Sequence, residues 1–153
     1  MDDLLNFLEH NTIYKTRTRA NIVPKDQRYL PKGTDPNKGR CWLKSKESLR
    51  TYTVKSGPYF DACVKVLPDA WKKICNAVTI NKDLVCHPHR DRHNKTDSLI
   101  LFLGDFEGGE LHLENGQTFS EKGVFHQFNG QKYLHWNSPI QSGTKYSIVY
   151  YCS

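Results

Sequence analysis

The second half of the chain alternates between short runs of aliphatic, aromatic and β-branched residues and turn signals such as Gly-Asp, Gly-Gly, Asn-Gly and Ser-Gly. Six such runs follow one another at a spacing of about 10–15 residues, which is typical of an all-β sandwich or jelly roll. We therefore predict at least six strands in this half, at 78–81, 98–103, 109–114, 123–128, 132–137 and 145–151.

The first half of the chain has a different pattern. Apolar side chains at positions 4, 5, 7 and 8 predict a short amphipathic helix from Asp2 to His10, with Asp2 or Asp3 as its N-cap. Residues 58–77 are expected to be helical in two pieces, the second of which opens at Pro68. These helices would pack on one sheet of the β core.

The remaining segment, residues 12–57, is rich in Lys, Thr, Pro and Gly and has weak periodicity. We expect long loops here, with two short strands near Ile22–Val23 and Thr51–Val54. A chain of 153 residues fits one domain with one core. Residues 1–57 would form its N-terminal helix and basic loop region, and residues 58–153 its helices and β core.

Cysteine usage and hydropathy exclude several classes of protein. The five cysteines are scattered and form no Cys-x-x-Cys pair, so neither a structural zinc cluster nor a disulfide framework is expected. No apolar run approaches the roughly 20 residues that span a bilayer. The acidic start of the chain also lacks the cationic and apolar regions of a secretory signal. We therefore expect an intracellular protein, in the cytoplasm or nucleus, that does not bind membranes.

Positive charge is concentrated between residues 11 and 55. This stretch holds 12 of the 22 Lys and Arg residues against three acidic residues, a local excess of nine positive charges. A solvated basic face would explain it, and so would a contact with a polyanion, because clustered cations gain from phosphate neutralisation and counterion release. Tyr29, Trp42 and Tyr52 lie among these charges, where they could stack on bases or belong to the core.

Candidate metal ligands lie in the sequence HPHRDRHN, residues 87–94. His89 and Asp91 are two positions apart, so on an extended strand both side chains point to the same side. One further histidine completes a set of two imidazoles and one carboxylate, which binds Fe(II) and leaves positions open for substrate and dioxygen. The candidate is His135, in the predicted strand 132–137. The alternative is a hydrogen-bonded polar cluster inside a β-sandwich.

His112 and His126, on other predicted strands, are expected to be structural.

A cation and a hydroxyl follow at a fixed distance. Lys145 comes ten residues after His135, and Ser147 comes two residues later at the start of the last predicted strand. On one face of a strand, such a pair can bind a dicarboxylate, with the lysine as a point charge at its far end. The succession of His-x-Asp, a glycine-bounded strand pair, a distal histidine and Lys-x-Ser is not expected by chance.

Residues 81–151 resemble the core of the 2-oxoglutarate- and Fe(II)-dependent dioxygenases, a double-stranded β-helix of the jelly-roll, cupin-like type. The motifs HRDRHN, SLILFLGDFEGGELHL, Phe-x-Gly, the distal histidine and GTKYSIVYY are most similar to those of the TET/JBP-like nucleic-acid base oxygenases. The resemblance covers about the last half of the chain. It implies a mainly β fold with flanking helices, which binds Fe(II), uses 2-oxoglutarate as cosubstrate and consumes O2.

The resemblance also implies a role for each position of the site. His89, Asp91 and His135 would be the iron ligands and the catalytic centre. The residues that would bind 2-oxoglutarate are Lys145 and Ser147 at its distal carboxylate and Asn81 at its keto acid end. The residues that would contact the substrate are Asn94, Tyr151, Arg90 and His93.

The reaction that the resemblance implies is hydroxylation of the methyl group of a methylated pyrimidine, 5-methylcytosine or thymine. The base would be in nucleic acid, DNA before RNA, and no obligate protein partner is implied. TET-like members usually carry Arg where this sequence has Lys145, whereas Lys serves in other branches of the superfamily. A prolyl or lysyl protein hydroxylase is therefore the alternative, and a non-catalytic nucleic-acid-binding β-sandwich is a third class. The small size of the chain for this superfamily suggests a virus, a phage or a compact microbial genome as its source.

Overall fold

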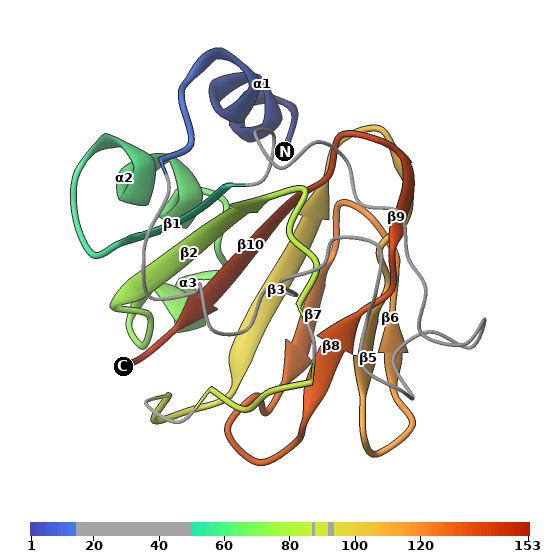
Figure 1. Cartoon of the computed structure of the whole chain (residues 1–153). Coiled ribbons are helices and arrows are strands. Elements are labelled where there is room, and N and C mark those ends of the chain that lie inside the picture. The colour runs from blue at the N-terminus through green and yellow to red at the C-terminus, as the bar shows by residue number, and fades with distance from the viewer. Residues whose placement is uncertain (15–49, 87, 92–93) are drawn as a thin grey trace.

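Five antiparallel strands form the larger of two facing layers in the computed structural model, which describes residues 1–14, 50–86, 88–91 and 94–153 (Figure 1). The order of the strands in this sheet is β1-β2-β10-β3-β7. Their bounds are Arg50–Val54 for β1, Ala77–Lys82 for β2, Tyr146–Tyr151 for β10, Ser98–Leu103 for β3 and Phe125–Phe128 for β7.

Shorter strands form the opposing layer. They are β6 (Thr118–Phe119), β5 (Leu111–Leu113) and β8 (His135–Asn137), in that order, and a separate pair, β4 (Phe106–Gly108) with β9 (Ile140–Gly143). An antiparallel bridge between His89 and His135 adds residues 88–91 beside β8. From β2 onward the chain thus crosses back and forth between the two layers, as it does in a jelly roll. The prediction of a mainly β fold is confirmed, and the two facing antiparallel layers agree with a jelly roll.

Helix α1 (Asp2–His10) has the predicted bounds, but the prediction of its N-cap is wrong. Met1 occupies the N-cap position, and no side chain there caps the helix. Asp2 and Asp3 lie in the first turn instead, where their negative charges complement the positive end of the helix dipole.

The two helices expected between residues 58 and 77 are shorter than predicted. They are α2 (Pro58–Val64) and α3 (Asp69–Lys72), and Pro68 is the N-cap of α3. Ala77 already belongs to β2, where it pairs with Tyr151 of β10. Pairing within the sheet therefore overrides the helical pattern at the end of this stretch. The strand predicted at 51–54 is observed as β1, whereas the one near Ile22–Val23 lies outside the described residues.

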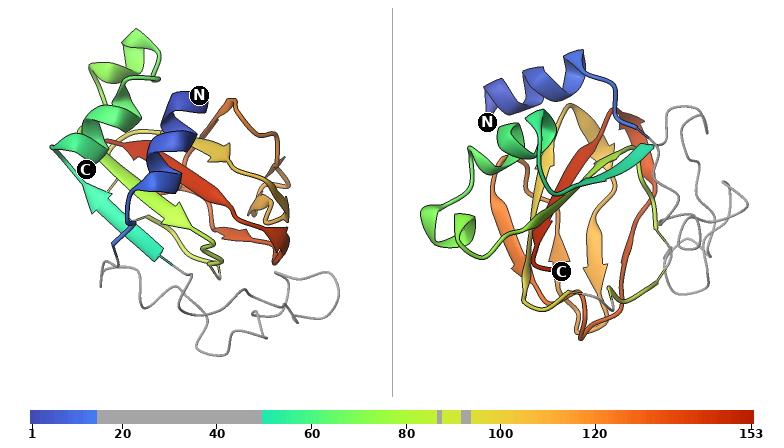
Figure 2. Two further views of the ribbon diagram at one scale, coloured as in Figure 1. Left: turned by 90° about the horizontal axis from the view of Figure 1, so that it is seen from above. Right: turned by 90° about the vertical axis from the view of Figure 1, so that its left-hand side faces the viewer.

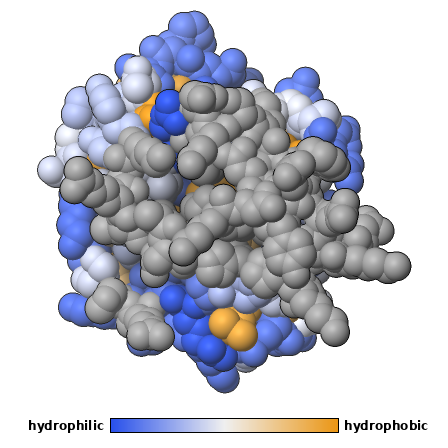
Figure 3. Space-filling model, viewed as in Figure 1, coloured by the Kyte–Doolittle hydropathy of each residue, from blue (hydrophilic) through white to orange (hydrophobic). Residues whose placement is uncertain are grey.

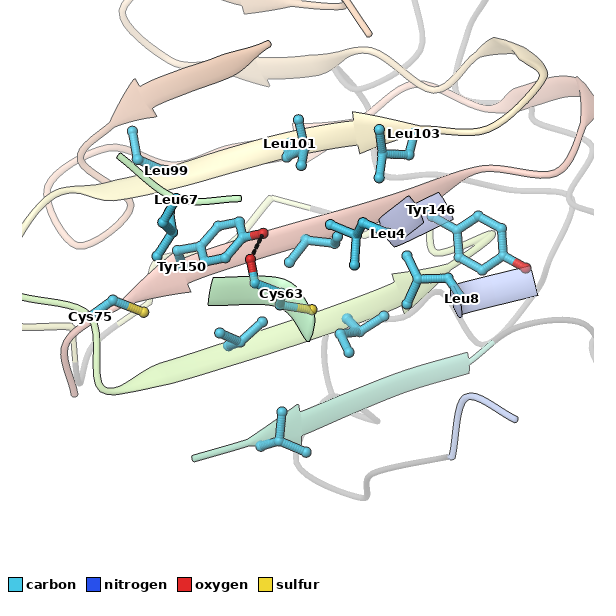
Figure 4. Close-up of a cluster of buried hydrophobic side chains, with 14 of the residues drawn as sticks. Leu4, Leu8, Cys63, Leu67, Cys75, Leu99, Leu101, Leu103, Tyr146 and Tyr150 are labelled. Atoms are coloured by element: carbon cyan, nitrogen blue, oxygen red, sulfur yellow. Dashed lines mark hydrogen bonds between the residues drawn. The ribbon is translucent and has the colours of Figure 1, made fainter. Parts of the chain in front are cut away.

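Side chains on the outer face of the five-stranded sheet pack against the helices. Leu4 and Leu8 of α1 and Cys63 of α2 join Ile148 and Tyr150 of β10 in one apolar cluster (Figure 4). The hydroxyl of Tyr150 donates a hydrogen bond of 2.8 Å to the carbonyl oxygen of Cys63. Figure 2 shows α1 and α2 on the side of this sheet that lies away from the shorter strands.

The inner face of the sheet packs against the shorter strands. Ile100 and Phe102 of β3 and Val149 of β10 form a second apolar cluster with Leu111 and Leu113 of β5. Since side chains alternate along a strand, the residues of β10 that face inward are Ser147, Val149 and Tyr151. The space between the two layers is therefore the place where side chains of both can meet.

The surface of the described residues carries few large apolar side chains. Those that are exposed are Met1, Tyr14, Ile74 and Val124. In the view of Figure 3, most of the coloured surface is hydrophilic, with separate small hydrophobic areas. No helix in the described part of the chain has both the length and the apolar character to cross a membrane.

Candidate metal centre

His89, Asp91 and His135 lie together, and each offers a ligand atom within 4.8 Å of the other two. His135 Nε2 is 3.2 Å from Asp91 Oδ2, and His89 Nε2 is 3.6 Å from Asp91 Oδ1. The centroids of the two imidazole rings are 4.3 Å apart. Their side chains are 10%, 15% and 6% exposed, respectively, so the cluster is largely shielded from water.

The backbone places these three side chains on one side. The amide of His89 donates to the carbonyl oxygen of His135 at 3.2 Å, and the amide of His135 donates back at 3.0 Å. Residues paired in this way across antiparallel strands have neighbouring side chains. The amide of Asp91 donates to the carbonyl oxygen of Gly130 at 2.9 Å, which fixes the second end of the His-x-Asp segment. This pairing is what brings the distal histidine to the motif.

Gly130 leaves room for the cluster. A Cβ atom at this position would lie 2.8 Å from Asp91 Oδ2 and 3.1 Å from His135 Cε1. Any side chain there would press on the carboxylate and on one imidazole. Gly130 is the glycine of the Phe-x-Gly motif, so the sequence contained a signal for it, but its closeness to the ligand atoms depends on the fold.

The orientation of His135 suits a metal ligand. Its Nδ1 lies 3.0 Å from the carbonyl oxygen of Tyr133. Because a carbonyl oxygen only accepts, Nδ1 donates this hydrogen bond, and Nε2 is the nitrogen that faces Asp91. Two imidazole nitrogens and one carboxylate oxygen form a donor set for Fe(II) and similar divalent metals. The donor set, the glycine and the orientation of His135 all fit such an ion.

Lys145, the residue before β10, is buried and only 1% exposed. Its Nζ donates a hydrogen bond of 2.5 Å to the carbonyl oxygen of Gly109, the one oxygen acceptor that the described residues give it. The ring centroids of Phe102 and Phe106 are 4.9 Å and 5.8 Å from Nζ. Burial lowers the pKa of Lys145 to about 8, against the opposing effect of nearby acidic groups.

Ser147 and Asn81 lie side by side on the inner face. They are paired across β10 and β2, and both are buried. Asn81 Oδ1 accepts a hydrogen bond of 2.8 Å from Thr51 Oγ1 on β1. Positions 145 and 147 are two residues apart, so side chains at both point to the same face of the sheet. Asn81, the partner of Ser147, lies on that face too.

The residues expected to contact a substrate have varied surroundings. Asn94 is buried, and its side-chain amide donates to Ser98 Oγ at 3.2 Å. The Tyr151 hydroxyl is hydrogen-bonded to Thr79 Oγ1 at 3.0 Å, on the inner face. Arg90 faces the opposite way from its neighbours His89 and Asp91, and its contacts are described below. His93 lies outside the described residues.

The other two strand histidines have protein partners. His112 is hydrogen-bonded through Nδ1 to Thr118 Oγ1 at 3.2 Å and through Nε2 to Ser138 Oγ. His126 Nε2 donates to the carbonyl oxygen of Glu121 at 2.8 Å. Burial lowers the pKa of His112. Among the described residues, neither belongs to a cluster that could hold a metal ion.

A search of solved structures gives two matches of low sequence identity. An oxidoreductase of the 2OG-Fe(II) oxygenase family from Burkholderia pseudomallei has a TM-score of 0.50 and 16% identity, over 71% of this chain and 69% of that chain. The structure of NgTET1 in complex with 5mC DNA has a TM-score of 0.47 and 19% identity, over 61% of this chain and 46% of that chain. This chain thus spans less than half of the NgTET1 chain.

Comparisons of the sequence itself find no related family or protein. No family model matches the chain, and no curated protein matches it either. At the identities above, the likeness to the Burkholderia oxidoreductase shows the fold alone. The chain therefore shares its fold with this oxidoreductase, and the activity has to be argued from the site.

Proposed function

We propose that this protein is an Fe(II)- and 2-oxoglutarate-dependent dioxygenase. The observation that carries the proposal is the meeting of His89, Asp91 and His135, with ligand atoms within 4.8 Å of one another inside a jelly roll. The buried Lys145 adds weight, because a buried ammonium opposes folding and would serve no purpose in a simple binding module.

The triad would hold the metal. His89 and His135 would each supply an imidazole nitrogen, and Asp91 would supply a carboxylate oxygen. When Fe(II) and 2-oxoglutarate are bound, they provide the activation of dioxygen that oxidises a C–H bond of the substrate. The protein would thus supply three donors, and the cosubstrate and dioxygen would occupy the other coordination positions of the metal.

Lys145 would bind the distal carboxylate of 2-oxoglutarate. A pKa of about 8 leaves most of the ammonium protonated at pH 7, and the rings of Phe102 and Phe106 exclude water, which strengthens an ion pair. Ser147, two positions further along β10, would donate a second hydrogen bond. Asn81, paired with Ser147, would bind the keto acid end.

For the substrate, we propose a methylated pyrimidine base, 5-methylcytosine or thymine, in DNA. The support is the excess of nine positive charges between residues 11 and 55, most of which lies outside the described residues. A base in a duplex would have to leave the stack to reach a metal inside the jelly roll. Asn94 and Tyr151 would contact the base, and His93 a phosphate.

The activity is tested by measuring succinate release with Fe(II), 2-oxoglutarate and methylated DNA. We expect release that requires the metal and is lost in His89→Ala and Asp91→Ala. Turnover that persists in both variants would exclude the triad as the metal site. Lys72→Ala, on the far helix α3, serves as the control that should keep wild-type turnover.

The substrate is tested by mass spectrometry of nucleosides after the reaction. A hydroxymethyl base would support the proposal for DNA. Unmodified DNA together with a hydroxylated prolyl or lysyl peptide would assign the enzyme to protein hydroxylation instead. DNA affinity that does not fall as salt is raised would contradict the contact proposed for the basic segment.

A further inference from the structure

Arg90 lies between two triad residues but faces away from them. The side chains of His89 and Asp91 share one side of the extended segment, so the residue between them points to the other side. The Arg90 side chain is 44% exposed. The sequence suggested a substrate contact for this arginine, whereas its hydrogen bonds lead to other parts of the same protein.

The guanidinium of Arg90 joins two further segments. Nη2 donates to Glu114 Oε1 at 3.0 Å, and Nε donates to the carbonyl oxygen of Lys132 at 3.1 Å. The same oxygen of Glu114 accepts the amide of Leu134 at 2.9 Å. One arginine thus links the His-x-Asp segment to the residue that follows β5 and to the turn that precedes β8.

That turn also supports two of the triad side chains. The carbonyl oxygen of Gly130 accepts the amide of Asp91 at 2.9 Å, and the carbonyl oxygen of Tyr133 lies 3.0 Å from Nδ1 of His135. A displacement of the turn would therefore move the carboxylate and turn the imidazole at the same time. The bonds from Arg90 and Glu114 reach the turn from the side opposite to the triad.

We propose that Arg90 and Glu114 form a clamp that positions the metal ligands. The inference rests on the metal centre proposed above. A half-exposed ion pair contributes little to the stability of the fold. Residues that orient metal ligands, in contrast, commonly change metal affinity by about 10–100-fold when they are replaced. The clamp therefore has a large effect on metal affinity and a small effect on stability, and this contrast separates positioning from general support of the fold.

The test is an anaerobic titration of the full chain with Co(II), followed by its visible absorption, beside thermal unfolding of the metal-free protein. Arg90→Met removes the guanidinium and keeps much of the aliphatic stem. We expect Co(II) affinity to fall about 10-fold or more. The unfolding midpoint should change by less than about 4 °C, because the ion pair contributes little to stability.

Two further variants locate the effect. Arg90→Lys keeps the charge but cannot bond Glu114 and Lys132 together as a planar fork does, so it should not restore affinity. Exchange of the charges, Arg90→Glu with Glu114→Arg, should recover part of the affinity that Arg90→Glu alone loses. Recovery of this kind is not expected if Arg90 only contacts substrate.

Lys72→Met is the matched control. Lys72 is 43% exposed and pairs with Asp69 at 3.5 Å within α3, away from the triad. It should leave Co(II) affinity unchanged, and equal losses in Lys72→Met and Arg90→Met would overturn the clamp. Wild-type affinity in Arg90→Met would overturn it too, while leaving the dioxygenase proposal intact. A wild-type protein that binds neither Co(II) nor Fe(II) would instead overturn the proposed function.

Discussion

The two faces of the five-stranded sheet differ in what they bury, although the same strand serves both. On the outer face, β10 contributes Ile148 and Tyr150, both fully buried among apolar side chains. On the inner face it contributes Ser147, beside Asn81 and just after Lys145, and these polar groups are buried as well. The outer face buries mainly apolar side chains, whereas the inner face buries a smaller apolar cluster together with polar groups, of which the Lys145 ammonium opposes folding.

The free energies involved have opposite signs. Each fully buried aliphatic or aromatic side chain on the outer face contributes roughly 1.5–3 kcal/mol. Burial lowers the pKa of Lys145 from 10.5 to about 8. Because one pKa unit corresponds to about 1.4 kcal/mol, keeping this ammonium protonated at pH 7 opposes folding by about 3 kcal/mol. The outer face makes such a group tolerable, and four variants or conditions test this division.

The largest effect is expected for Ile148→Ala on the outer face. Removal of three carbon atoms from a fully buried position should lower the free energy of unfolding by about 4 kcal/mol and the unfolding midpoint by about 10 °C. The matched variant is Ile100→Ala, which acts on the inner face, where the described apolar cluster is smaller. A greater loss in Ile100→Ala than in Ile148→Ala, measured by urea unfolding, would reverse the comparison.

Lys145→Met should have the opposite sign. It replaces a buried ammonium by an apolar side chain of similar length, so the metal-free protein should become more stable at pH 7 by up to about 3 kcal/mol. At the same time, 2-oxoglutarate should no longer bind measurably in calorimetry. A variant that is destabilised and still binds 2-oxoglutarate would remove Lys145 from the site. Lys122→Met is the control, because Lys122 Nζ also donates a hydrogen bond to a carbonyl oxygen, that of Phe106, but is only partly buried.

Tyr150→Phe tests a polar contact within the outer cluster. Loss of the hydroxyl leaves the carbonyl oxygen of Cys63 without its 2.8 Å donor, which should lower the free energy of unfolding by about 1.5 kcal/mol. Metal and 2-oxoglutarate affinities, measured by titration, should stay as in the wild type because the residue faces away from the triad. A change in either affinity would show that the two faces are not independent.

Local sequence patterns were sufficient for the elements that carry their own periodicity. Helix α1 and strand β3 have the predicted bounds, because each is amphipathic or continuously apolar over its length. Strands β4, β6 and β9 were not predicted, since each has only two to four residues and is defined by its partner. Gly108 and Gly143 also made β4 and β9 look like turns, and both adopt a positive φ.

At the candidate site, too, local sequence patterns predicted some residues, whereas others depend on contacts that the fold creates. The spacing of His89, Asp91 and His135 selected three residues that the fold brings within 4.8 Å. The residues that support them were not predicted, because a carbonyl oxygen such as that of Tyr133 or a distant partner such as Glu114 leaves no pattern in the sequence. The contacts depend on strand pairing, which only the assembled sheet determines.

The smallest effect is the dependence of stability on pH, and its sign follows from Lys145. The folded-state pKa, about 8, lies below the unfolded value of 10.5, so between these values the unfolded chain binds more protons and stability rises with pH. Burial of Cys63 acts the other way. It raises the pKa of the thiol to about 12 in the folded state, so the thiol ionises at lower pH in the unfolded chain and stability falls as pH rises.

The contribution of Lys145 is therefore measured as the difference in stability between the wild type and Lys145→Met. The advantage of that variant should shrink by about 1 kcal/mol between pH 7 and pH 9. A constant difference across this range, in urea unfolding, would mean that the ammonium is solvated and that the inner face does not oppose folding as argued.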